Sequence, residues 1–185
     1  MIEEATEAIA EGLVVGLPTD TVYGVGVDPQ NEEAVTLLYE LKGRPAHKPV
    51  GLLVADVAQA REIGVLTDAA ADLAERHWPG ALTLVVIPRV VLPDWVGHRY
   101  LRTVGIRVPD HPVALELLRR TGPLAVTSAN RSGEPEAMSD VDAREIFGDQ
   151  VAVYLEGECP GGEPSTVVDA TGATLVVLRE GPVKV

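Results

Sequence analysis

Aromatic residues and cysteine are scarce in this sequence, and it has no long apolar run. Aromatics make up 4% of the residues while 46% are hydrophobic, so the core must be built from aliphatic side chains, as in an α/β sheet covered by helices. The one cysteine, Cys159, has no partner for a disulfide or a structural zinc site, which agrees with a reducing compartment. No stretch approaches the ~18 apolar residues that span a bilayer, and the N-terminus lacks a secretory pattern. The sequence therefore predicts a cytoplasmic protein with no membrane partner.

Cations are outnumbered by acids. The chain has 15 Lys and Arg against 28 Asp and Glu, a formal net charge of −13. A general nucleic-acid binder needs clustered cations, and an acidic overall field repels RNA. Phosphate-loop, dinucleotide-fold and HExxH metal motifs are also missing, and the four histidines lack metal-ligand spacing. The acidic balance argues against a general nucleic-acid binder and stays compatible with a local basic pocket.

Hydrophobic periodicity and capping residues predict alternating strands and helices. Helices are expected at 2–11, from Asn31 to about 42, and at 56–63, 68–78, 112–120 and 139–148. Strands are expected at 13–17, 50–55, 81–87, 104–108, 124–127, 151–155, 166–170 and 174–179, with an irregular loop at 88–102. This order predicts an α/β (α+β) mixed sheet flanked by helices, in a length of 185 residues that fits one domain.

A polar loop follows the first predicted strand. Thr19, Asp20, Thr21 and Tyr23 bring two hydroxyls, a carboxylate and a phenol together directly after an apolar segment. Ligands of α/β proteins tend to bind where such loops leave strand ends. The alternative is a turn that uses Pro, Thr and Asp for local hydrogen bonds.

The densest basic segment is residues 42–49. Lys42, Arg44, His47 and Lys48 lie among two prolines that stiffen the loop. Lys as a point charge and Arg as a bidentate fork suit a polyphosphate. Alternatively, Lys42 complements a helix C-terminus and the other cations are solvated.

Polar residues also occur on later predicted strands. Thr103 and Arg107 share one strand face with Gly105, and a buried Arg in that position needs an anionic partner, either a ligand or a structural acid. Ser128 and Asn130 end another strand, as in a binding site or in an ordinary turn. Ser165 and Arg179, further along, are ambiguous when taken singly.

Six segments in this order resemble the YrdC/Sua5 family of threonylcarbamoyl-AMP synthases. They are LPTDTVYG (17–24), LKGRPAHKP (41–49), WPGALTLVV (78–86), VGIRVPDHPVA (104–114), TSANRSGEP (127–135) and STVVDAT (165–171). The match covers nearly the whole chain, and six ordered motifs are more specific than any one of them. The resemblance implies a single YrdC-like catalytic domain over residues 1–185, as in short bacterial-type members. It also implies a twisted mixed sheet with a positively lined concave cavity.

The resemblance assigns roles to the ambiguous residues. It implies that threonine is bound by Thr21, Arg107 and Ser165, that ATP is bound by Arg44, Lys48, Thr103, Ser128, Asn130 and Arg179, and that Lys42 and Arg44 are catalytic. Where some members carry a threonine-contacting histidine, this chain has Leu53. Threonine affinity or selectivity is therefore expected to be built differently here.

The implied reaction joins L-threonine, bicarbonate and ATP into threonylcarbamoyl-AMP and pyrophosphate, for N6-threonylcarbamoyladenosine modification of tRNA. Lys and Arg without a covalent nucleophile suit catalysis by positioning and charge neutralisation. Mg²⁺ is expected on the triphosphate, held by phosphate and water with no protein side-chain ligand. The implied partners are the downstream tRNA threonylcarbamoyl-transferase machinery and an RNA contact.

Two other hypotheses stay open. The domain could bind double-stranded RNA or ribosome precursors without catalysis, a hypothesis that the acidic balance disfavours. It could instead perform carbamoyl-adenylate chemistry with carbamoyl phosphate, as in hydrogenase-maturation relatives. Those relatives carry additional acylphosphatase and zinc modules, which this sequence does not contain.

Overall fold

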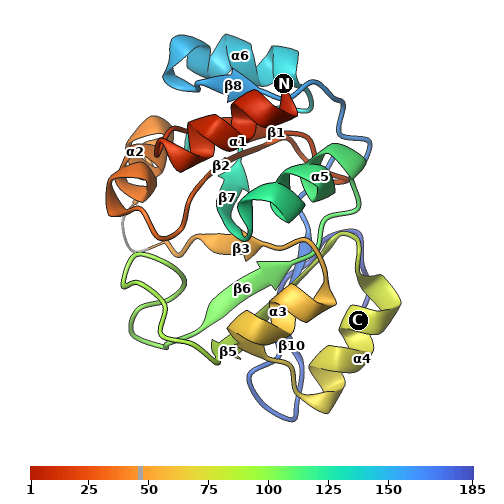
Figure 1. Cartoon of the computed structure of the whole chain (residues 1–185). Coiled ribbons are helices and arrows are strands. Elements are labelled where there is room, and N and C mark those ends of the chain that lie inside the picture. The colour runs from red at the N-terminus through yellow and green to blue at the C-terminus, as the bar shows by residue number, and fades with distance from the viewer. Residues whose placement is uncertain (46–47) are drawn as a thin grey trace.

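The chain forms one large mixed sheet with helices packed against it (Figure 1). The computed structural model describes residues 1–45 and 48–185; Ala46 and His47 of the basic segment lie outside them. The helices are α1 (Ile2–Ala10), α2 (Glu32–Lys42), α3 (Val57–Ile63), α4 (Asp68–His77), α5 (Pro112–Thr121), α6 (Asp140–Phe147) and the short 3₁₀ helix η1 (Gly148–Gln150). The strands are β1 (Val15–Leu17), β2 (Gly24–Val27), β3 (Gly51–Leu53), β4 (Gly64–Val65), β5 (Leu82–Pro88), β6 (Val104–Arg107), β7 (Leu124–Ser128), β8 (Val153–Tyr154), β9 (Thr166–Asp169) and β10 (Val176–Arg179).

The helices begin at the polar residues that the sequence offers as caps. The side chains of Asn31, Thr67 and Ser139 accept hydrogen bonds from backbone N–H groups of α2, α4 and α6, which would otherwise lack partners. Helix α2 ends where Gly43 adopts a left-handed conformation at φ 58°. The predicted starts of these three helices are confirmed.

The sheet mixes parallel and antiparallel neighbours. Its order is β10-β9-β5-β6-β3-β7-β2-β1-β8, and β4 pairs with β5 off this path. Strand β5 is antiparallel to β6 and parallel to β9, while β3 is parallel to β6 and antiparallel to β7. Residues 82–86, 103–107, 124–128 and 165–169, far apart in the sequence, thus lie close together on neighbouring strands.

Helices pack on both faces of the sheet. Leu52 and Ile106 face α3 and α4, whereas Leu53 and its register partner Leu124 face α1 and α5 on the opposite side. In Figure 1, α1 and α5 lie at its upper half and α3 and α4 at its lower half. The first pair packs with β1, β3, β7 and β8 in one apolar cluster, and α3 and α4 pack against β5 and β6 in the main cluster. The helices in the described part of the chain are all too short or too polar to cross a membrane.

Strand β2 was not anticipated from the sequence. Its residues, Gly24–Val27, alternate glycine with valine, and glycine weakens strands because it has no side chain to pack. The strand is buried between β1 and β7, and a Cβ added at Gly26 would lie 2.9 Å from Cγ2 of Val126. The close approach of the neighbouring strand therefore requires glycine in this strand and outweighs its low strand propensity.

Candidate active site

The sheet face opposite α3 and α4 forms the floor of a cavity of about 460 Å³, beside the part of that face on which α1 and α5 pack. Along β5, Leu82 and Leu84 are fully buried toward the helices, while Thr83 and Val85 line the cavity. Side chains of a strand alternate between faces, and alternate residues of three strands reach the cavity: Thr83 and Val85 of β5, Gly105 and Arg107 of β6, and Val167 and Asp169 of β9. The expected placement of Thr103, Gly105 and Arg107 on one face is confirmed by this lining.

Small residues make the space. Gly24, Gly51 and Gly105 line the cavity from three strands. A Cβ added at Gly105 would lie 3.2 Å from Cγ2 of Thr83 on the adjacent strand. Larger side chains at these positions would fill the volume, so the glycines keep the floor open.

One end of the cavity is built around Arg107. Its guanidinium pairs with the carboxylate of Asp20 and donates to Oγ1 of Thr21 at 2.8 Å and to the carbonyl oxygen of Gly80 at 3.0 Å. Thr21 Oγ1 also lies 3.0 Å from Oγ1 of Thr19. Burial lowers the pKa of Arg107, and the charge of Asp20 opposes this shift. The sequence left open whether Arg107 pairs with a structural acid or faces a ligand. In the structure it does both, because it pairs with Asp20 and also lines the cavity.

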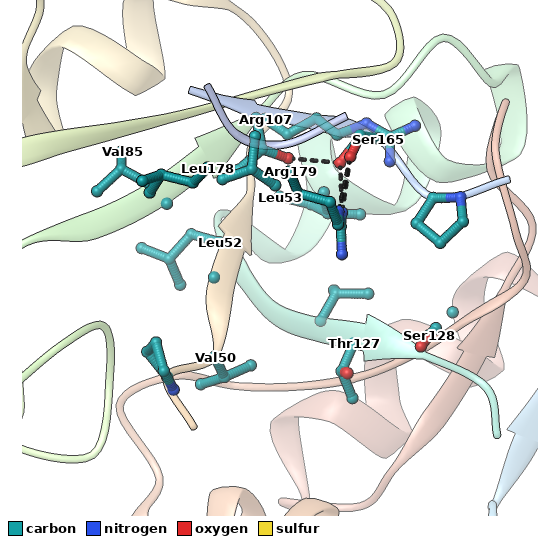
Figure 2. Close-up of a pocket in the computed structure, with 18 of the residues that line it drawn as sticks. Val50, Leu52, Leu53, Val85, Arg107, Thr127, Ser128, Ser165, Leu178 and Arg179 are labelled. Carbon is teal, nitrogen blue, oxygen red and sulfur yellow. Dashed lines mark hydrogen bonds between the residues drawn. The ribbon is translucent and has the colours of Figure 1, made fainter. Parts of the chain in front are cut away.

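A second group of contacts lies beside it, at Ser165 and Arg179. Figure 2 shows both residues together with Arg107 at the rim of the pocket. Arg179 donates to the carbonyl oxygen of Ser165 from Nε at 3.0 Å and from a terminal nitrogen at 2.8 Å. The Ser165 hydroxyl lies 2.8 Å from Oγ1 of Thr83. Burial lowers the pKa of Arg179, and so does the charge of Arg107, while Glu136 opposes the shift; Arg179 thus lies between the Arg107 end and the rest of the cavity.

Among the described residues of the basic loop after α2, Arg44 and Pro49 line the cavity. Arg44 donates to the carbonyl oxygen of Pro49 at 2.7 Å, with its guanidinium 5.9 Å from the ring centroid of Tyr39. Lys48 is exposed and does not line the cavity, although its carbonyl oxygen accepts from Tyr39 Oη at 2.7 Å.

The resemblance predicts Lys42 as a catalytic cation, but the structure places its side chain outside the cavity. Its side chain is 2% exposed and absent from the cavity lining. The ammonium group donates to the carbonyl oxygen of Ser128 and, at 2.7 Å each, to the backbone and side-chain oxygens of Asn130. Its three donors are thus all used inside the protein, and the group stabilises the loop after β7. Asn130 is likewise buried behind the lining, whereas Ser128 faces the cavity.

Seven of the ten residues to which the resemblance assigns binding or catalytic roles line this cavity. They are Thr21, Arg44, Thr103, Arg107, Ser128, Ser165 and Arg179. Leu53 also lines it, in register with Arg107 on the parallel neighbour strand. An aliphatic side chain therefore stands beside the guanidinium where a histidine was noted in some relatives.

The sequence analysis missed several lining residues. Thr83 and Asp169 could have been found by carrying the two-residue alternation through the predicted strands at 81–87 and 166–170. Glu136 and His98 come from loops, where no periodicity indicates direction. Two carboxylates, Glu136 and Asp169, thus share the cavity with three arginines.

The described residues include no cluster of three or more His, Cys, Asp or Glu side chains able to hold a metal ion. Mg²⁺ in nucleotide sites is usually held by substrate phosphates, water and one or two carboxylates. Glu136 and Asp169 supply carboxylates without forming a closed cage, so the cavity fits a magnesium ion that enters with a nucleotide.

A cavity on the face of a mixed α/β sheet, lined by hydroxyls and arginines, defines a small-molecule site for anionic ligands. The family model for Sua5, YciO and YrdC proteins, which carries the description "Telomere recombination", matches residues 7–181. The chain belongs to this family.

Individual relatives cover nearly all of the chain. A Mycobacterium tuberculosis relative is 46% identical over 184 residues, which are 98% of this chain and 84% of its own length. The threonylcarbamoyl-AMP synthase of Vibrio cholerae is 37% identical and covered to 97% on both sides. The crystal structure of Pyrococcus abyssi Sua5 complexed with L-threonine superimposes with a TM-score of 0.92 at 38% identity over 97% of this chain. The present chain spans only 54% of that protein.

Proposed function

We propose that this protein is an L-threonylcarbamoyladenylate synthase. It joins L-threonine, bicarbonate and ATP into threonylcarbamoyl-AMP, with release of pyrophosphate and water. The observation that carries the proposal is a single cavity lined by Thr21 and Arg107 at one end and by Arg44 and Ser128 from other strands and loops. The family membership and the Vibrio cholerae synthase support the same reaction.

Threonine binds at the Arg107 end. Two N–H groups of the guanidinium are not used by Asp20, Thr21 or Gly80 and are available to a carboxylate. Thr21 and Ser165 offer hydroxyls for the polar atoms of the amino acid. The threonine complex of the Pyrococcus abyssi relative supports threonine as a ligand of this domain. Leu53 gives this pocket an apolar wall beside Arg107.

ATP binds along the rest of the floor. Arg44 and Arg179 supply positive charge to the phosphates, Thr103 and Ser128 supply hydroxyls, and Lys48 reaches the nucleotide from its exposed position. Lys42 and Asn130 contribute by fixing the loop that presents Ser128. Lys42 is thus proposed as a positioning residue and Arg44 as the catalytic cation.

The reaction needs charge neutralisation and alignment more than a covalent nucleophile. The amine of threonine adds to the carbon derived from bicarbonate, and a carbamate oxygen then attacks the α-phosphorus while the bond to pyrophosphate breaks. Holding both substrates in line supplies roughly 7–11 kcal/mol of the barrier reduction. Mg²⁺ bound to the triphosphate would neutralise charge on the leaving pyrophosphate. The product is a mixed anhydride, which an acyl transfer to an adenosine of tRNA would consume.

Pyrophosphate release by the purified protein tests the proposal. We expect release that requires both L-threonine and bicarbonate, with a nucleotide product of the mass of threonylcarbamoyl-AMP. Arg107→Ala should mainly raise KM for threonine, and Arg44→Ala should mainly impair the use of ATP. Release without threonine, or equal effects of the two substitutions on both substrates, would contradict the proposal.

A further inference from the structure

Glu136 is an acidic side chain in the basic part of the cavity. It is partly buried and lines the same space as Arg44 and Arg179. None of the salt bridges among residues 1–45 and 48–185 involves its carboxylate. A carboxylate near the phosphates of ATP would repel them, so its presence calls for a cation between the two.

The loop that carries Glu136 is held in place at both ends. Asn130 donates from Nδ2 to the carbonyl oxygen of Glu134 at 2.7 Å, and Lys42 holds Asn130 from the other side. The backbone of Ala137 donates to Ala129 at 2.9 Å and accepts from Tyr23 at 2.9 Å. Position 136 is therefore fixed between two anchored residues.

The charge of Glu136 acts on the cations proposed for the nucleotide end. It opposes the lowering of the pKa of Arg179, which burial and Arg107 cause. It acts in the same way on Lys42, whose pKa is lowered mainly by burial and then by Arg44. The carboxylate therefore lies within electrostatic reach of the residues proposed to bind the phosphates of ATP.

We infer that Glu136 binds the magnesium ion that accompanies ATP, either directly or through one of its waters. The inference rests on the proposed function, and it departs from the expectation that phosphate and water alone hold the ion. Mg²⁺ in such sites characteristically uses one or two carboxylates together with substrate phosphates, and Glu136 provides such a carboxylate from an anchored loop.

Titration calorimetry with a non-hydrolysable ATP analogue, with and without Mg²⁺, tests this. In the unchanged protein, Mg²⁺ should strengthen binding. In Glu136→Gln, that gain should fall by about tenfold, while binding of the metal-free analogue should become tighter because a like charge is removed. A smaller gain in affinity from Mg²⁺ together with tighter binding of the metal-free analogue distinguishes metal binding from a merely structural role. Manganese bound with the analogue, followed by electron paramagnetic resonance, should be weakened by the same substitution.

Glu134→Gln is the matched control. Glu134 is exposed, belongs to the same loop and does not line the cavity, so the variant removes an equal charge nearby. It should keep the full gain from Mg²⁺. An unaltered gain in Glu136→Gln, or an equal loss in both variants, would overturn this inference while leaving the synthase proposal intact. Absence of nucleotide binding by the unchanged protein would overturn both.

Discussion

Asp20 decides how Arg107 is presented. The carboxylate accepts from the guanidinium and, at 2.9 Å, from the backbone N–H of Asp110, so it joins two loops to the end of β6. An Arg with 7% exposure would otherwise leave its charge without a protein partner in the absence of ligand. Asp20 thus acts on threonine through Arg107.

We therefore expect Asp20→Asn to raise KM for threonine with little change in kcat. A charge-assisted hydrogen bond contributes about 1.5–3 kcal/mol, which corresponds to a rise of roughly 10- to 100-fold. Steady-state kinetics with threonine varied at saturating ATP would measure it. Asp110→Asn, which keeps the backbone donor, should behave like the unchanged protein, and Asp20→Glu should recover part of the loss. A purely kcat effect of Asp20→Asn would contradict this role.

Lys42 predicts a pH dependence of stability. Its pKa is lowered from 10.5 to about 8, first by burial and then by the Arg44 charge. Between these two pH values the unfolded chain binds more protons at this position than the folded chain. The contribution of this group to the free energy of unfolding therefore rises with pH in that window.

Lys42→Met should remove this rise. From pH 7.5 to pH 10 the unchanged protein should gain on the order of 1–3 kcal/mol of unfolding free energy relative to the variant. Urea unfolding of both proteins at stepped pH would measure the difference, and the comparison cancels other titrating groups. Parallel curves for the two proteins would show that Lys42 keeps its proton throughout this range.

At the scale of the element, strand β6 separates function from stability by alternation. Gly105 faces the cavity, and Ile106, fully buried, faces the helices. Substitutions at neighbouring positions should therefore act on different properties.

Gly105→Val should fill the cavity floor between β5 and β3 and weaken binding of the ATP analogue by at least about tenfold, since ligand sites depend on a preformed shape. Ile106→Val should leave binding unchanged and lower the unfolding free energy by about 0.5–1.5 kcal/mol. Calorimetric titration and denaturant unfolding of both variants would measure the two effects. Loss of binding in Ile106→Val with none in Gly105→Val would contradict the assignment of the two faces.

At the scale of the whole molecule, a small basic cavity lies in a chain of net charge −13. At physiological salt, charges that are more than a Debye length of ~8 Å apart are largely screened from each other. The three cavity arginines therefore attract a ligand inside the cavity but not a polyanion that lies on the outer surface. A mononucleotide enters the cavity, where local cations dominate, but a duplex would lie on the acidic exterior.

We therefore expect no binding of a 20-base-pair RNA duplex tighter than about 100 μM at 150 mM salt. Fluorescence anisotropy with a labelled duplex would measure it, with binding of the ATP analogue as the check on folded protein. A dissociation constant near 1 μM that weakens steeply with salt would instead revive the RNA-binding hypothesis.

Local patterns in the sequence were sufficient to predict most of the helices and strands. They were also sufficient to predict which residues of the strand at 103–107 share one face. The caps at Asn31, Thr67 and Ser139 act within three residues, and the alternation along residues 103–107 acts within one strand. Such short-range geometry follows from the backbone period alone. The resemblance of six motifs then indicated which polar residues belong together.

Strand order was decided only by the tertiary structure, and three features of the site depend on it. The pairing of Asp20 with Arg107 joins residues 87 positions apart, and the contact of Lys42 with Asn130 joins residues 88 positions apart. Glu136 gains its place in the cavity from anchors on Ala129 and Tyr23. The sequence by itself determined which residues carry charge and which strand face each occupies. Which charges meet was decided by the packing of distant strands, because no local period encodes contacts across so many residues.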